Sequence, residues 1–181
     1  MEHNPSILQQ IIDSCSQNDR KAQKMLYEMY AGKMLAICMR YCGDYQTAQD
    51  LMHDGFINVF TNIKQYQNKG SFEGWMRKVM VNVSLNYYRQ NKVVFEGDED
   101  AAAMISDTLQ PDQLQQLSAK EILETIAQLP NEQRIIFNLF AIEGYTHAEI
   151  AEKLNIKETT VRSNYFRARL TLQKMIERNN K

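Results

Sequence analysis

Apolar side chains recur at intervals of three and four residues through most of this 181-residue chain, and this spacing predicts helices. Before residue 91 the pattern divides into four helices, at 6–15, 20–42, 45–66 and 72–90. After residue 111 it continues with helices at 113–128 and 131–143, followed by two closely spaced helices between 146 and 175. Seven glycines and three prolines are few enough to leave these runs intact. We therefore predict an all-α protein.

A charged segment separates the two groups of helices. Residues 96–100 read EGDED, which is too charged to bury in a core, and few large apolar residues follow before Pro111. We expect two small helical domains, at 1–90 and 112–181, joined by a flexible acidic linker at 91–111. The second domain carries the closely spaced pair of helices.

That pair has the sequence signals of a helix-turn-helix. Thr146 and Glu149 are spaced as a capping box, and Asn155 stands where the chain must turn, a place that suits its tolerance of the left-handed conformation. In the second helix one stripe is predicted to be buried: Val161, Tyr165, Ala168, Leu172 and Met175. Four residues lie off that stripe: Arg162, Ser163, Phe166 and Arg167. They are near the start of the second helix, which is the part of a recognition helix that reaches base edges in the major groove. The alternative is a helical hairpin with a solvated basic face, but the cap, the turn and the arginines together favour DNA binding.

Charge is strongly segregated although the net charge is only −1. Residues 61–92 hold six basic side chains against one acidic, residues 153–181 hold eight against two, and residues 93–125 hold eight acidic against one basic. Two separated basic blocks suit a polyanion bound at two places, although a charge run by itself is usually a solvated face.

The first basic block contains the elements needed to hold unpaired bases. A loop at 65–70, which we expect to be mobile, precedes a helix with aromatic, amide and basic side chains. Within that helix one apolar stripe is predicted to face the core: Phe72, Trp75, Val79 and Val83. Trp75 is therefore interpreted as a core residue, and the polar residues of the helix and loop are the better candidates for nucleic-acid contact.

Taken together, these residues resemble a known family. Its motifs occur in order as Ala48-x-Asp50-Leu51 with Asp54 and Phe56, Phe72-x-x-Trp75 with Asn82, Leu129-Pro130, Arg134, Glu149-Ile150-Ala151, Thr160-Val161 and Arg167-Ala168-Arg169. Across residues 25–175 the chain resembles the extracytoplasmic-function (ECF) group of the sigma-70 family of bacterial RNA polymerase sigma factors. The resemblance implies a transcription initiation factor that binds core RNA polymerase, through the clamp helices of the β′ subunit and the flap of the β subunit, and recognises promoter DNA. It also implies an anti-sigma factor as a partner.

The resemblance assigns roles to individual residues. Polymerase docking is assigned to Asp50, Leu51, Asp54 and Phe56, with the alternative, which we favour for Phe56, that the apolar pair is partly core. Capture and melting of the minus-ten element is assigned to the loop at 66–71 and the helix after it, through Lys69, Ser71, Arg77, Asn82 and Asn86. The residues Arg162, Ser163, Phe166 and Arg167 are assigned to duplex reading at the minus-thirty-five element.

Four positions depart from the family pattern. His53 and Gly55 replace a glutamine-like and an aliphatic residue, and a glycine inside a helix costs about 1 kcal/mol relative to alanine, so the docking helix is expected to be locally weaker. Lys157 replaces a small capping residue, and Asn164 stands where a basic residue is common. The last two leave the preferred promoter sequence open.

Other classes of function are not supported by the sequence. No signal peptide or membrane-spanning run is recognised, so we expect a cytoplasmic protein without membrane insertion. Cys38 and Cys42 could share a metal with His53, but buried reduced thiols are the better interpretation, and neither a metal nor a cofactor is expected. The three histidines are far apart and no phosphate-binding glycine loop occurs, so we predict no catalytic residues and no enzyme activity.

The sequence leaves two alternatives to a sigma factor open. A conventional helix-turn-helix activator or repressor would bind operator DNA without replacing a sigma subunit. A helical adaptor with no nucleic-acid role would leave Arg162 and Arg167 unexplained.

Overall fold

The computed structural model describes residues 5–91 and 119–179, and every regular element in those two ranges is helical. The all-α prediction is confirmed. The chain divides into two compact units, Met1–Gln90 and Asn91–Lys181. The linker predicted at 91–111 lies outside the described residues, apart from Asn91 at the end of a helix. Within the described ranges, no helix has the length and apolar composition needed to cross a bilayer.

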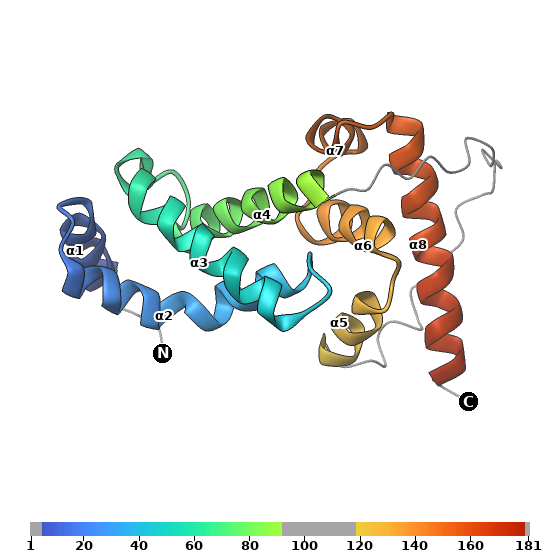
Figure 1. Ribbon diagram of the computed structural model, residues 1–181, viewed down its shortest axis with the longest axis horizontal. Helices are drawn as coiled ribbons and strands as arrows, with labels where there is room; N and C mark the ends of the chain where they lie inside the picture. The colour runs from blue at the N-terminus through green and yellow to red at the C-terminus, as the bar shows by residue number, and fades with distance from the viewer. Residues whose placement is uncertain (1–4, 92–118, 180–181) are drawn as a thin grey trace. The chain divides into compact units, whose positions relative to one another are not determined.

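The described part of the first unit is a set of packed helices (Figure 1). Its elements are α1 Pro5–Ser16, α2 Arg20–Met39, α3 Tyr45–Asn62, the short 3-10 helix η1 Ile63–Gln65, and α4 Phe72–Asn91. Helix α2 packs against both α1 and α3, and η1 packs against α1 and α3.

Local hydrogen bonds explain where these helices start and stop. Asp19 caps α2 by accepting from the amide of Lys21 at 2.8 Å, and Asp44 caps α3 by accepting from the amide of Thr47 at 2.8 Å. Two of the predicted ends, 42 and 66, were too late. After Met39 the amides of the next residues bond to carbonyls three residues back, and after Asn62 the chain tightens into η1, so both α-helices end earlier.

The buried face of α4 differs from the prediction. Of the predicted stripe only Phe72 is buried, while Trp75, Val79 and Val83 are half-buried. The side chains of α4 that are buried are Phe72, Met76, Met80, Val81, Ser84, Leu85 and Tyr88. The core of this unit is therefore rich in methionine, whose unbranched side chain fills irregular gaps between helices.

Gly55 marks a close approach between α3 and α4. A Cβ atom added at this buried glycine would lie 2.2 Å from Sδ and 2.8 Å from Cε of Met80, which is itself fully buried. The thioether of Met80 thus occupies the volume that a side chain at position 55 would fill. The glycine that the sequence marks only as a weak point in the helix has a packing role.

We expect the effect of Gly55→Ala on stability to depend on the residue at position 80. In a Met80→Ala background the added methyl group has room, so Gly55→Ala should stabilise the first unit by about 1 kcal/mol through helix propensity. With Met80 present, displacement of its side chain should reduce or reverse that gain. Urea unfolding followed by the fluorescence of Trp75, the one tryptophan of the chain, measures this. Equal effects of Gly55→Ala in the two backgrounds would disprove the packing role.

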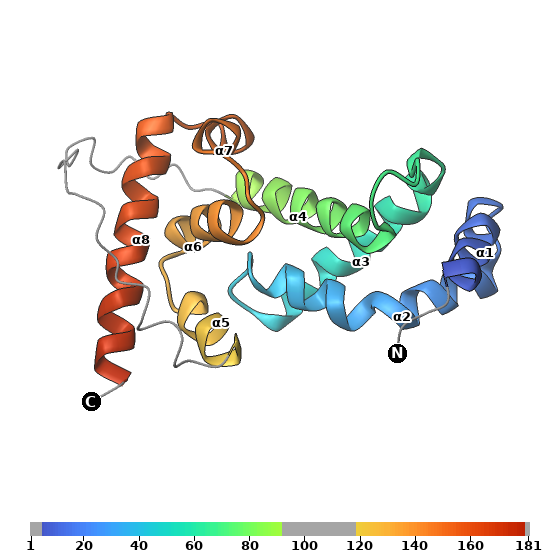
Figure 2. The ribbon, with the colours of Figure 1, turned by 180° about the vertical axis from the view of Figure 1, so that it is seen from behind.

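The second unit is built around one long helix (Figure 2). Its elements are α5 Ala119–Ala127, α6 Asn131–Phe137, the π-helical turn η3 Asn138–Ile142, α7 His147–Leu154, and α8 Glu158–Asn179. Helix α8 packs against α5, α6 and α7. One cluster in its core joins α5 to α8 through Ile126, Leu129, Ala168 and Leu172, with Phe137 and Ile142 packed against it.

Two features refine the helix predicted at 131–143. The helix is interrupted, since α6 ends at Phe137 and passes into η3, in which the amide of Glu143 bonds to the carbonyl of Asn138 at 3.0 Å. Arg134 is buried, and its guanidinium donates to the carbonyl of Ala127 at 3.1 Å and to the side chain of Asn131 at 2.9 Å. This arginine therefore ties α6 to the end of α5.

The helix-turn-helix signals are confirmed. Thr146 and Glu149 form both bonds of the capping box, and the bonds from Thr146 hold the pKa of the Glu149 carboxyl below its usual value. Asn155 has φ 53° and ψ 52°, which is the left-handed conformation. The predicted stripe of α8 needs two corrections: Tyr165 and Met175 are half-buried, whereas Asn164 and Ile176 are buried.

Candidate nucleic-acid and polymerase interfaces

The four residues predicted to read duplex DNA share one face of α8. Their spacing in the helix puts them on the side opposite the buried residues Val161, Asn164 and Ala168. Arg162 and Arg167 are exposed, and Ser163 and Phe166 are half-buried. The Ser163 hydroxyl donates to the carbonyl of Thr160 at 3.1 Å, so its oxygen remains available as an acceptor. The structure thus brings the predicted set together in the first three turns of the helix.

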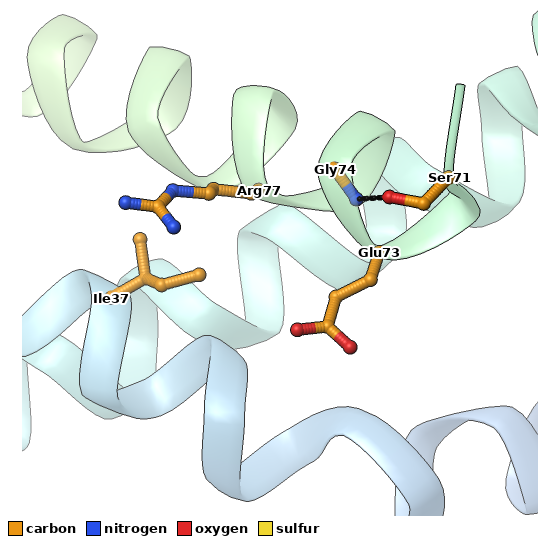
Figure 3. Close-up of a pocket in the computed structure, with 5 residues that line it drawn as sticks. All are labelled: Ile37, Ser71, Glu73, Gly74 and Arg77. Atoms are coloured by element: carbon orange, nitrogen blue, oxygen red, sulfur yellow. Dashed lines mark hydrogen bonds between the residues drawn. The ribbon is translucent and has the colours of Figure 1, made fainter. Parts of the chain in front are cut away.

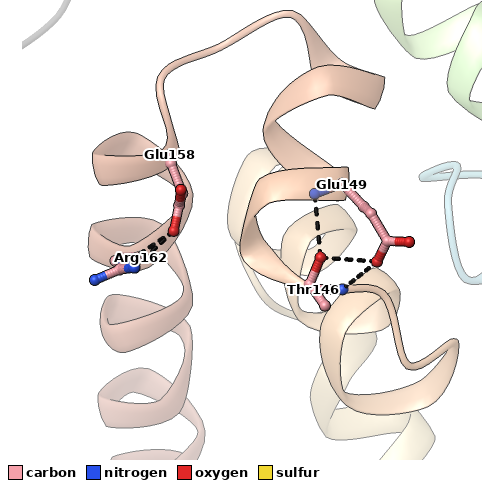
Figure 4. Close-up of polar contacts among 4 residues, drawn as sticks. All are labelled: Thr146, Glu149, Glu158 and Arg162. Carbon is pink, nitrogen blue, oxygen red and sulfur yellow. Dashed lines mark hydrogen bonds and ion pairs between the residues drawn. The ribbon is translucent and has the colours of Figure 1, made fainter.

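Arg162 has a partner that we did not predict. Glu158 is the first residue of α8, and its Oε1 accepts from Nη2 of Arg162 at 2.6 Å and from Nε at 3.1 Å (Figure 4). The pair could have been predicted, because Glu158 and Arg162 are oppositely charged and four residues apart on one helix. Asn164 departs from the family pattern, which commonly has a basic residue here. In the structure it is buried, and its side chain donates to the carbonyl of Thr160 at 3.1 Å.

An aromatic cluster fixes α8 against the preceding elements. The ring of His147, at the start of α7, stacks on Phe140 of η3 with centroids 4.4 Å apart and planes 9° apart. Tyr165 of α8 packs on the same Phe140 at 4.5 Å. Burial, with the nearby charge of Arg162, lowers the pKa of His147, whereas Glu158 acts in the opposite direction. Phe140 thus links the start of α7 to α8 through its contacts with His147 and Tyr165.

The candidates for the minus-ten strand lie on two sides of α4. Asn82 and Asn86 are exposed and, with the spacing of one helix face, lie beside the exposed basic residues Lys78 and Arg89. Arg89 donates to the side-chain oxygen of Asn86. Sequence reasoning missed both basic residues as part of this face, although the same spacing of three and four residues identifies them.

Arg77 faces a different environment. It lines a cavity of about 410 Å³ with Ile37 of α2 and with Ser71, Glu73 and Gly74 at the start of α4 (Figure 3). Lys33 of α2 bonds to Glu73 at 2.6 Å across the boundary between the two helices. The structure therefore separates Arg77 from the face that carries Asn82 and Asn86.

The loop before α4 has a defined turn. Asn68 and Gly70 have φ of 55° and 90°, and the Tyr66 hydroxyl donates to the carbonyl of Gly70 at 2.8 Å, which closes the loop. The ring of Tyr66 packs on Trp75 at 5.8 Å, so Trp75 belongs to an aromatic group at the base of the loop. Lys69 is exposed at the tip.

Ser71, at the end of the loop, has a structural bond. Its hydroxyl accepts from the amide of Gly74 at 3.1 Å, so it caps the start of α4 (Figure 3). If Ser71 also contacts the melted strand, its hydroxyl must do so while it accepts the bond from Gly74.

The predicted docking residues on α3 are divided between surface and core. Asp50 and Asp54 are exposed, whereas Leu51 and Phe56 are only 4% and 3% exposed. Leu51 and Phe56 are therefore both core residues. The core interpretation, favoured from the sequence for Phe56, holds for Leu51 as well. Ile57, which sequence reasoning missed, is 63% exposed on the same helix.

Comparisons with known proteins decide the family. Residues 26–93 match the family model for Sigma-70 region 2, and residues 119–172 match that for Sigma-70, region 4. The chain is 26% identical to RNA polymerase sigma-H factor of Pseudomonas aeruginosa over 93% of each chain. It is also 25% identical to ECF RNA polymerase sigma factor SigW of Bacillus subtilis, over 91% of this chain and 94% of SigW. The chain belongs to the ECF group of the sigma-70 family.

This sigma factor directs transcription initiation, the activity that defines its family. A structure of the sigma factor RpoE in complex with the anti-sigma factor NepR from Bartonella quintana is similar with a TM-score of 0.49 and 18% identity, over 85% of this chain and 96% of that one. A structure of CnrH in complex with the cytosolic domain of CnrY has a TM-score of 0.46 and 18% identity, over 92% and 95%. The two family-model segments contain every site residue predicted from the sequence.

The cysteines of the sigma factor are buried thiols. Burial raises the pKa of Cys38 to about 12 and that of Cys15 to about 11, and the Cys42 thiol donates to the carbonyl of Cys38 at 3.0 Å. His53 lies outside this group, exposed on α3, with Nε2 at 3.1 Å from the Tyr27 hydroxyl. Among the described residues, no three potential metal-binding side chains come together.

Proposed function

We propose that this ECF sigma factor binds core RNA polymerase in the cytoplasm and recognises a promoter with its two units. The first unit would dock on the clamp helices of the β′ subunit and capture the minus-ten strand. The second would contact the flap of the β subunit and read the minus-thirty-five duplex. RNA polymerase would supply all catalytic groups, so the sigma factor itself would need neither a metal nor a cofactor.

The observation that carries this proposal is the exposed face of α8. Arg162 and Arg167 project from the first turns of the second helix of a helix-turn-helix, with Ser163 and Phe166 between them. Arginine donates two bonds to a guanine edge in the major groove, and phenylalanine contacts a thymine methyl group. A helix with such a face, preceded by a capped first helix and a left-handed turn, suits duplex reading.

Run-off transcription tests the proposal. Purified bacterial core RNA polymerase would transcribe fragmented DNA of the source genome with and without the sigma factor, and the 5′ ends of the transcripts would be mapped. We expect new start sites that share two upstream motifs. Duplex binding by the protein alone, without new start sites, would instead favour a conventional activator or repressor.

The minus-ten assignment is strongest for the exposed face of α4. Asn82, with Lys78 and Arg89 on the same face, offers an amide and two positive charges to a single strand. We expect Asn82→Ala to reduce the fraction of open complexes by about threefold to tenfold, the effect of one lost hydrogen bond. Permanganate footprinting of unpaired thymines measures this. Gln10→Ala is a control, because Gln10 is an exposed amide on a different helix, α1; equal losses in both variants would argue against a specific contact.

The resemblance to the ECF group also supports an anti-sigma factor as a partner. We expect the sigma factor without polymerase to bind promoter duplex weakly. Tight and promoter-specific binding by the isolated protein would count against this view of its regulation.

A further inference from the structure

The ion pair between Glu158 and Arg162 stands where DNA is expected to approach. Both side chains are on the surface, with 42% of Glu158 and 66% of Arg162 exposed. An exposed pair four residues apart adds little to stability. A carboxylate at the start of a recognition helix also repels phosphates, which are the main source of affinity for DNA of any sequence. A carboxylate in the first turn of a helix does interact favourably with the helix dipole, but this effect is small at an exposed position. Helix stability therefore gives only a weak reason for this glutamate, and affinity for DNA gives none.

The geometry of the pair points to control of the arginine's direction. Glu158 holds the Nε and Nη2 side of the guanidinium through one oxygen, at 3.1 and 2.6 Å (Figure 4). A guanidinium has five N–H donors in one plane, so the donors of Nη1 and the second hydrogen of Nη2 remain for another acceptor. Those remaining donors form the planar fork that matches two acceptors on a guanine edge.

Ordering this side chain before it binds should favour the correct sequence. An unrestrained arginine adapts to phosphates and to many base edges, and it loses rotamer freedom when it binds. A held arginine has lost that freedom already and presents its fork in one direction. The gain in affinity appears only on a DNA sequence whose base acceptors lie in that direction. The repulsion between Glu158 and the phosphates acts on every sequence.

We propose that Glu158 is a specificity-determining residue of this sigma factor. Its charge weakens binding to DNA in general, and its hydrogen bonds to Arg162 increase the preference for the minus-thirty-five element over other sequences. The inference rests on the proposed role of α8 in reading duplex DNA.

Two substitutions separate the charge from the hydrogen bonds. Glu158→Gln removes the charge but keeps an oxygen that accepts from Arg162, whereas Glu158→Ala removes both. Holoenzyme reconstituted with each variant would be titrated with a mapped promoter duplex and with the same duplex carrying a shuffled minus-thirty-five element. We expect both variants to bind the shuffled duplex more tightly than wild type. Only Glu158→Ala should lose preference for the intact promoter, by about twofold to fivefold, which is the range that the coupling of an exposed ion pair allows.

Controls connect the effect to Arg162 and to this end of the helix. Glu177→Ala makes the same change at an exposed position near the other end of α8 and should leave the preference unchanged. In an Arg162→Ala background, Glu158→Ala should cause no further loss of preference. A wild-type preference in Glu158→Ala, or an equal loss with and without Arg162, would overturn the inference. If wild type itself shows no preference for the intact duplex, then the duplex-reading role of α8 fails, and this inference fails with it.

Discussion

Asp50→Arg is expected to abolish binding of this sigma factor to core RNA polymerase while its helical content stays unchanged. Asp50 is exposed on α3, and Asp54 is exposed one helical turn later, so the two carboxylates form one acidic surface. An interface that accepts this surface should meet it with positive charge. Placing a guanidinium there creates a like-charge contact, which costs on the order of 3 kcal/mol or more, or over a hundredfold in affinity.

The fold should tolerate this substitution. Asp50 accepts one long bond, of 3.4 Å, from Gln46 at the exposed surface of the helix, and arginine is a good helix former. Co-elution with core RNA polymerase in size-exclusion chromatography measures the interaction, and circular dichroism measures the helices. Asp13→Arg is the matched control, because it makes the same change at an exposed position of α1. Normal co-elution of Asp50→Arg would remove this residue from the docking surface.

The elements that the sequence predicts best are those determined by neighbouring residues. The capping box of Thr146 and Glu149 and the left-handed Asn155 depend on contacts within a few residues, and the structure confirms them. The face of α8 is also largely predictable, because its charged residues lie on one side of the helix; the exceptions to a clean separation are Asn164, which is buried, and Phe166, which lies among the polar candidates. The four duplex-reading candidates therefore lie together as expected.

Features that depend on contacts between helices were harder to predict. Helix α4 has apolar residues around most of its first three turns, so its sequence does not decide whether Val79 or Met80 faces the core; packing against the other helices decides this. Gly55 and Met80 are 25 positions apart, and helix propensity registers only the cost of the glycine and not the space that it provides. Leu51 was assigned to docking through resemblance to a family, and burial is a property that such resemblance does not supply.

Arg162→Ala is expected to weaken recognition of the minus-thirty-five element by about 1 to 3 kcal/mol, the range for a lost bidentate contact to a base pair. The change removes the donors that Glu158 holds in place and leaves the Glu158 carboxylate without this cation, so repulsion of phosphates should add a loss that is the same for all sequences. Two effects are therefore expected, and one of them depends on sequence. Titration of holoenzyme with the promoter and with single-base-pair variants of its minus-thirty-five element separates them.

A base-pair change at the position that Arg162 reads should weaken wild type strongly and Arg162→Ala hardly at all. Changes at other positions of the element should weaken both proteins equally, because contacts at separate positions are roughly additive. Arg178→Ala is the control for lost positive charge, since Arg178 is exposed in the last turn of the same helix. If Arg162→Ala weakens binding to every variant by the same factor, then Arg162 contacts phosphate, and sequence discrimination by α8 must come from Ser163, Phe166 and Arg167.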